Sequence, residues 1–169
     1  MPNVTATIQL GLAALITGSP VVGSSQAAVN LQPGVALSNG TGAGQADTVW
    51  WTQSTLTASA TETWDFAGTL RDQLNNLVTF ARIKALLVFA SASNTNNIVI
   101  GGGASTITTL FGATTHTTPV RPGGFVCWAT GINDAIGYAI TAGSADLLQI
   151  GNGAGSSSTY QICAVGASA

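Results

Sequence analysis

Hydrophobic and polar residues alternate in short stretches along most of the chain, and the strongest apolar run lies near its middle. From Thr61 to Phe66 the side chains alternate at period two, so Trp64 and Phe66 share one face of an expected strand. From Ile83 to Ala90 only Lys84 interrupts the apolar residues, which is typical of a central strand buried on both faces. The two runs predict a sheet around which the rest of the chain is organised.

The residues between these runs leave two interpretations open. Asp72 to Asn76 is rich in Asp and Asn, which favour turns because their side chains bond nearby backbone. A turn there gives a strand, a turn and a second strand. The alternative is a short helix from Thr69 to Leu77, since three leucines recur at helical spacing behind a Thr that could cap it. With the turn, the side chains expected to be buried are Trp64, Phe66, Phe80, Ile83, Leu87 and Phe89.

Residues 1–44 alternate short β-prone pieces (VTATIQL, PVV and AAVNL) with turn signals at Pro33-Gly34 and Asn39-Gly40. This segment holds no aromatic residue and contributes little to a core. We therefore expect an extended N-terminal arm that lies along the domain or reaches a neighbouring subunit. Its strands would have open edges with which a neighbour could pair.

Residues 45–169 repeat short apolar stretches between turns rich in Gly, Pro and Asn. Trp50 and Trp51 are adjacent in one expected strand and must point to opposite faces. Further strands are expected at 98–100, 125–128, 137–141, 145–150 and 159–165, with a β-prone STITTLF stretch and a polar loop at 114–121. Many short strands, with at most the one short helix considered above, predict an all-β, antiparallel β-sandwich, and the jelly roll is the preferred version for a chain of this length.

Charged residues make up only 6% of the 169 residues, against roughly a quarter in ordinary soluble domains. Six of the ten lie between Glu62 and Ala90. Four basic residues and a net charge of -2 give no clustered positive patch, so neither nucleic acid nor a membrane surface is an expected partner. So little charge protects a lone chain poorly against self-association, and we expect a symmetric homo-oligomer. A homotrimer is the oligomer that we expect, although the composition itself does not fix the number of subunits.

No segment approaches the eighteen or more apolar residues of a membrane span, and no positively charged start resembles a secretory signal. Two cysteines, Cys127 and Cys163, are too few for a disulfide scaffold. Both lie in strand-like runs where small buried hydrophobes are common, so we expect buried free thiols.

Candidate catalytic chemistry is sparse, and we expect no enzyme. The single histidine, His116, lies in a polar loop, and no Gly-x-Ser-x-Gly elbow is present. Neither cysteine has metal-ligand spacing, so no metal site is expected. Glu62 and Asp65 would point to opposite faces of a strand, and the alternative pair of Asp134 and Asp146 has no supporting context. The glycines at 101–103 lack the Lys and the following helix of a phosphate loop, so no cofactor is expected either.

Four segments together resemble a family of tailed-bacteriophage virion proteins. They occur in this order and span roughly residues 39 to 168: NGTGAGQAD at 39–47, DFAGTLRD at 65–72 leading to FARIKA at 80–85, RPGG at 121–124, and GYAITAGSADLL at 137–148 with GAS at 166–168. The resemblance implies a small structural protein of the phage particle with a jelly-roll fold. Its implied role is that of a capsid decoration (cement) protein, bound to the major capsid protein or another virion protein at the capsid surface and assembled in the bacterial cytoplasm.

The rival hypothesis is a receptor- or carbohydrate-binding module of a phage tail or fibre, because jelly rolls are common in lectins and exposed aromatic rings stack on sugars. Trp51, Trp128 and Tyr138 are the candidate residues for ligand stacking. Packing in the core or at a subunit interface is the alternative for each of them.

Overall fold

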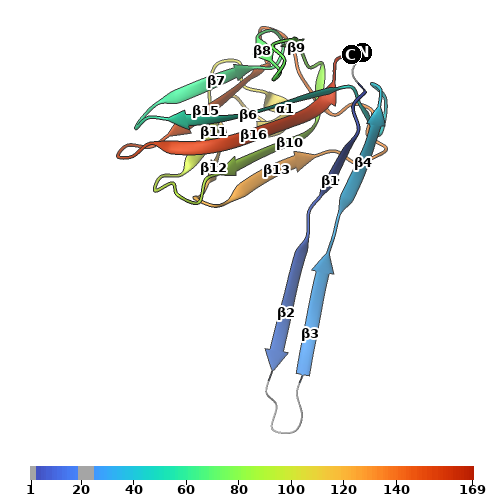
Figure 1. Ribbon diagram of the computed structural model, residues 1–169, viewed down its shortest axis with the longest axis vertical. Coiled ribbons are helices and arrows are strands. Elements are labelled where there is room, and N and C mark those ends of the chain that lie inside the picture. The colour runs from blue at the N-terminus through green and yellow to red at the C-terminus, as the bar shows by residue number, and fades with distance from the viewer. Residues whose placement is uncertain (1–2, 19–24) are drawn as a thin grey trace.

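The computed structural model of the chain describes residues 3–18 and 25–169, and Figure 1 shows a β domain from which a long two-stranded ribbon projects. The domain is an antiparallel β-sandwich. Its first sheet has the order β13 (Phe125–Ala129), β10 (Arg82–Ala90), β16 (Ser158–Ala167) and β6 (Thr48–Leu56), with β14 (Tyr138–Ala139) beside β10. Its second sheet has the order β12 (Thr117–Val120), β11 (Ile98–Gly101), β15 (Leu147–Asn152) and β7 (Thr61–Asp65). The predicted β-sandwich is confirmed, whereas the jelly-roll connectivity stays a prediction.

The core lies between the inner faces of the two sheets. Alternation along the strands places Leu86 and Val88 of β10 and Tyr160 and Ile162 of β16 on the inner face of the first sheet, where all four are buried. The second sheet contributes Ile98, Ile100, Leu148 and Ile150, each fully buried. The adjacent tryptophans divide as predicted, because Trp50 is 2% exposed in the core and Trp51 is 54% exposed on the outer face of β6.

A short polar relay crosses the core and joins the two sheets. Trp64 Nε1 of β7 donates to Tyr160 Oη of β16 at 2.7 Å, and Tyr160 Oη donates to Glu62 Oε2 at 2.8 Å. Burial raises the pKa of Tyr160, and the bond to Glu62 raises it further, so the phenol stays protonated and remains a donor. The Glu62 carboxylate therefore serves as the acceptor that ends this set of hydrogen bonds.

Lys84 occupies a β-bulge at the start of β10. The pairing with β16 shifts between Ile83 and Ala85, so Lys84 is the extra residue, and its side chain is buried. Its Nζ donates to the Asp134 carbonyl oxygen at 2.5 Å, and Arg82 donates to the Ala135 carbonyl at 2.9 Å. Both cations therefore bond the same loop. The sequence would have given them Asp65, Asp72 or a carboxylate at an interface as partners, and the structure pairs them with neither Asp65 nor Asp72.

The segment after β7 folds as a turn and not as the alternative helix. β8 (Leu70–Arg71) and β9 (Leu77–Val78) form a small hairpin, and Asp72 Oδ1 accepts the backbone N–H groups of Leu74 and Asn76. Two other local predictions were wrong. The β-prone STITTLF stretch contains a one-turn helix, α1 (Thr108–Phe111), and the expected polar loop at 114–121 contains β12.

The N-terminal arm is a continuous antiparallel ribbon of two paired segments. At its base β1 (Ala6–Gln9) pairs with β4 (Gly34–Asn39), which also pairs with β5 (Gln45–Ala46), and farther out β2 (Leu12–Gly18) pairs with β3 (Ser25–Leu31). Figure 1 shows β2 and β3 extending away from the sandwich. The PVV piece of the sequence prediction lies outside the described residues.

One face of this ribbon is apolar from its base to Ile16 and Ala27, and we call it the apolar arm face. Cross-strand pairing joins even-numbered residues of the first segment to odd-numbered residues of the second, so these side chains share one face: Val4, Ala6, Ile8, Leu10, Leu12, Ala14, Ile16, Ala27, Val29, Leu31, Val35 and Leu37. The opposite face mixes Leu15 and alanines with Thr17, Gln26 and Asn30. Val4 and Leu37 at the base are buried against Ala85 and Val165 of the first sheet, whereas Leu12, Ile16, Val29 and Leu31 are exposed.

Leu86 and Leu87 provide a matched test of the sandwich, because they are neighbours in β10 on opposite faces. Leu86 is fully buried, whereas Leu87, expected from the sequence to be buried, is 40% exposed on the outer face. Leu86→Ala should therefore lower the free energy of unfolding by about 2–5 kcal/mol, and Leu87→Ala by less than about 1.5 kcal/mol in the isolated chain. Urea unfolding of both variants makes the measurement, and equal losses would contradict the assignment of the two faces.

Candidate functional site

The three aromatic residues proposed for ligand stacking do not form one site. Trp51 is exposed on the outer face of the first sheet, while Trp128 lies on the inner side of β13 and meets Phe111 edge-on at 5.5 Å between ring centroids. Tyr138 is half-buried and packs against the core. Packing therefore accounts for Trp128 and Tyr138, and Trp51 alone is presented to solvent.

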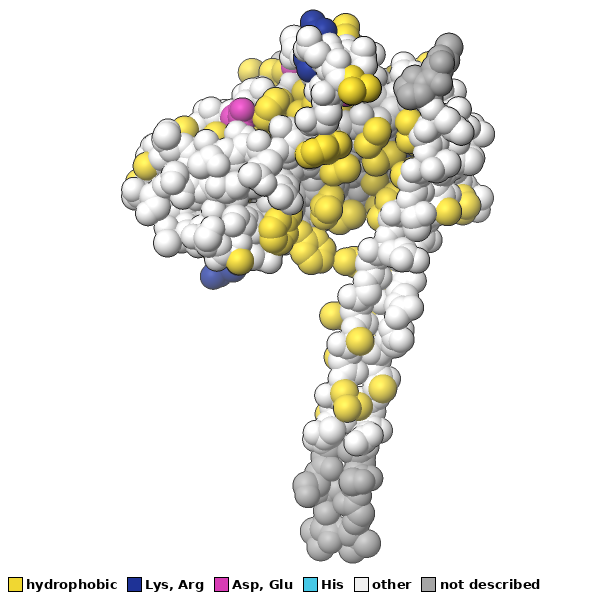
Figure 2. Space-filling model, in the orientation of Figure 1, with side chains coloured by type: hydrophobic (Ala, Val, Ile, Leu, Met, Phe, Trp, Pro, Cys, Tyr) yellow, Lys and Arg dark blue, Asp and Glu magenta, His cyan; other side chains and the backbone are white. Residues whose placement is uncertain are grey.

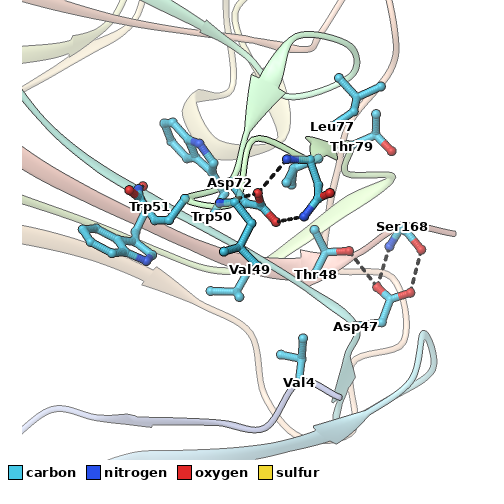
Figure 3. Close-up of a pocket in the computed structure, with 14 residues that line it drawn as sticks. Val4, Asp47, Thr48, Val49, Trp50, Trp51, Asp72, Leu77, Thr79 and Ser168 are labelled. Carbon is cyan, nitrogen blue, oxygen red and sulfur yellow. Dashed lines mark hydrogen bonds between the residues drawn. The ribbon is translucent and has the colours of Figure 1, made fainter. Parts of the chain in front are cut away.

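Trp51 lies at a cleft of about 540 Å³ between β6 and the β8–β9 turn (Figure 3). The carboxylates beside it are already bonded to nearby protein groups. Asp72 accepts hydrogen bonds from Asn76, and Asp47 accepts 2.6 and 2.8 Å bonds from the hydroxyl and backbone N–H of Ser168. These bonds hold the turn and the C-terminal segment in place, so both carboxylates are engaged in local structure and the cleft presents one exposed indole.

A second hollow, which we call the apolar groove, lies between the base of the arm and the outer face of the first sheet. Its volume is about 480 Å³. The arm contributes Ile8 and Leu10, and the sheet contributes Leu87, Phe125, Cys127 and Cys163. Figure 2 shows hydrophobic side chains gathered on this part of the domain beside the arm. Among the described residues, no charged side chain lines the groove.

The sheet side of the groove belongs to an apolar row that crosses all four strands. Cys127 of β13 pairs with Leu87, Leu87 pairs with Cys163 of β16, and Cys163 pairs with Trp51 of β6. All four side chains therefore point to the outer face. The outward face of a sandwich sheet is ordinarily polar, so an uncharged apolar row this wide marks a surface suited to binding another protein.

The titratable residues considered for catalysis serve local structure. His116 Nδ1 lies 2.7 Å from the Phe111 carbonyl oxygen. Asp65 accepts from Ala67 N, Asp134 from the N–H groups of Ile136 and Gly137, and Asp146 from Gly143 N. The bonds from Gly137 and Ile136 lower the pKa of Asp134. Each of these three carboxylates thus accepts backbone hydrogen bonds that stabilise a turn, and this local structural role accounts for the carboxylate at that position.

Within residues 3–18 and 25–169, no three His, Cys, Asp or Glu side chains are grouped so that they could hold a metal ion. The same part of the chain contains no helix with the length and apolar character needed to cross a membrane. Comparisons of the chain with protein-family models, with curated proteins and with solved structures found no match.

Sequence reasoning missed the apolar groove and the apolar arm face. The signal for the arm face was present, since every even-numbered residue from Val4 to Ile16 is apolar. Reading the segment as separate short pieces hid this alternation, which continues through Gly11. The groove could not be predicted from the sequence, because its position depends on which half of β10 the arm covers in the folded chain.

Neither cysteine should form a disulfide within its own chain. Cys127 and Cys163 lie on either side of Leu87, two strand spacings or roughly 10 Å apart, beyond the reach of about 7 Å between bridged Cα atoms. Both are half-buried rather than buried as expected, and burial raises the pKa of each thiol. We expect two free thiols after denaturation and slow iodoacetamide labelling of the native chain at pH 7. An intrachain disulfide peptide would contradict the register of β13, β10 and β16.

Asp47 should make stability depend on pH through its bonds to Ser168. Burial raises its pKa, but the hydrogen bonds from Ser168 and Thr48 outweigh burial and leave the pKa below its ordinary value. A lowered folded-state pKa means that the carboxylate stabilises the fold above about pH 4 and ceases to do so as the pH falls through the folded-state pKa. Asp47→Asn should cost up to about 1 kcal/mol at pH 6, where the bonds to Ser168 are exposed to solvent, and progressively less as the pH falls through the folded-state pKa, measured by urea unfolding. A cost independent of pH would contradict this role.

Proposed function

We propose that this protein is a structural subunit of a tailed-bacteriophage particle, which binds the outside of the capsid as a decoration protein and stabilises the shell. The observation that carries the proposal is the projecting ribbon, whose apolar face the chain's own domain leaves uncovered beyond Leu10. An isolated two-stranded hairpin is marginally stable in water, so an exposed one with an apolar face serves best within an assembly. The resemblance of residues 39–168 to phage virion proteins supplies the kind of assembly.

The proposed attachment relies on apolar and hydroxyl-rich contacts with the major capsid protein or another virion protein, and on association between copies of this chain. The arm holds no charged residue, because Asp47 is the first in the sequence. Screening by salt should therefore change the affinity little. Binding to the intact shell alone would stabilise each site by about 2.7 kcal/mol when free protein is in hundredfold excess over the Kd.

A shortened arm tests the proposal on stripped particles. Leu10 N bonds the Pro33 carbonyl oxygen at 3.1 Å, so an Asn-Gly turn can replace residues 11–32 without disturbing the buried base. We expect the full-length chain to rebind and to raise the temperature of genome release equally at 50 and 500 mM salt. The shortened chain should remain folded and lose at least tenfold in occupancy. Equal occupancy of particles by the two chains would show that the arm takes no part in attachment.

A carbohydrate-binding module is the second candidate, supported by the exposed Trp51 at its cleft. Ring stacking on one exposed indole could hold a sugar weakly. Glycan-array binding that Trp51→Ala abolishes, together with a full-length chain that never rebinds particles at either salt concentration, would favour this candidate over decoration.

A further inference from the structure

We infer that the exposed outer part of the apolar arm face packs against the outer face of the first sheet of a second copy of the chain, beside the apolar groove. The inference rests on the self-association in the proposed function and is independent of the capsid. Four facts about the arm and the sheet lead to it.

The apolar arm face already makes this kind of contact within one chain. Its base, at Val4, Ala6, Ile8 and Leu37, packs against Ala85 and Val165 on the outer face of β10 and β16. The same face continues in register to Leu12 and Ile16, where the described part of its own domain no longer covers it. The outer part of the face therefore carries the chemistry that suits an apolar sheet face, without such a face beneath it.

The first sheet has the complementary uncovered area. The arm base covers the Ala85 and Val165 end, and beyond it Leu87, Phe125 and Trp51 remain exposed. Both surfaces lack charged side chains, so neither would leave a buried ion unpaired on contact. Each chain thus provides one apolar ribbon and one apolar sheet surface of matching character.

The ribbon cannot reach the sheet of its own chain, because β2 and β3 extend away from the sandwich (Figure 1). A second copy of the chain supplies such a sheet surface. Because every copy has one ribbon and one sheet surface, each ribbon in an assembly can find a partner. Contact between two different patches of identical subunits is heterologous. Repeated contacts of this kind either close into a ring of subunits or continue as an open filament. A closed ring of three would give the expected trimer.

Disulfide trapping tests the contact directly, because Cys127 and Cys163 lie on the receiving face. Single cysteines are placed on the apolar arm face by Ala14→Cys, Ile16→Cys and Val29→Cys. The matched controls on the opposite face are Ala13→Cys, Leu15→Cys and Ala28→Cys. The full-length variants are oxidised with oxidised glutathione at pH 8.5, with isotope-labelled and unlabelled chains mixed, and the linked peptides are identified by mass spectrometry.

We expect interchain disulfides from the apolar-face cysteines to Cys127 or Cys163 at a yield at least tenfold above that of the controls. Equal yields from both faces, links between arms only, or no links to the sheet would overturn the inference. Wild-type chain that stays monomeric at all concentrations would do the same.

A pair of charge substitutions separates this contact from particle binding. Ile16 and Leu15 are adjacent, 71% and 58% exposed, and on opposite faces of β2. Ile16→Asp should weaken self-association in sedimentation experiments at least tenfold, and Leu15→Asp less than threefold. Equal effects would overturn the inference. Rebinding to stripped particles, measured separately on wild-type chain, decides the capsid proposal, so either one can fail while the other stands.

Discussion

The pairing of β10 with β16 is the interaction on which the rest of the structure depends. It joins residues 82–90 to residues 160–167, and each strand then contributes to two surfaces. Leu86, Val88, Tyr160 and Ile162 form the inner face and fill the core, while Ala85, Leu87, Cys163 and Val165 form the outer face. The arm base packs on that outer face, so the core, the groove and the position of the arm all follow from one register.

The composition of β10 makes sense only when both of its faces are considered. A strand with so few polar residues is expected to be buried on both sides, yet the outer face is covered only at its Ala85 end. Covering the exposed part of a Leu or Ile side chain contributes on the order of 1 kcal/mol. Association between copies would cover six such exposed side chains and contribute several kcal/mol of binding free energy. They are Leu87 and Phe125 on the sheet and Leu12, Ile16, Val29 and Leu31 on the arm.

The sequence was most informative where alternation was strong. It predicted the strands at 61–66 and 83–90, the division of Trp50 and Trp51 between two faces, and the turn at Asp72, because side-chain period and Asx chemistry are local properties. It failed where tertiary contacts decide. The bulge at Lys84 turns that cation toward the Asp134 loop, and Leu87 is exposed because the arm diverges from the sheet. Trp51, Trp128 and Tyr138 could not be grouped or separated without the register that places two of them against the core.

Hydrogen exchange of the arm, measured as a function of protein concentration, tests the central claim most directly. If a second copy covers the apolar arm face, amides of β2 and β3 should gain at least tenfold protection as the protein concentration is raised from below to above the dissociation constant for self-association. Amides in β10 and β16 should stay unchanged. Protection of β2 and β3 that is absent, or equally strong, at every concentration would contradict the account.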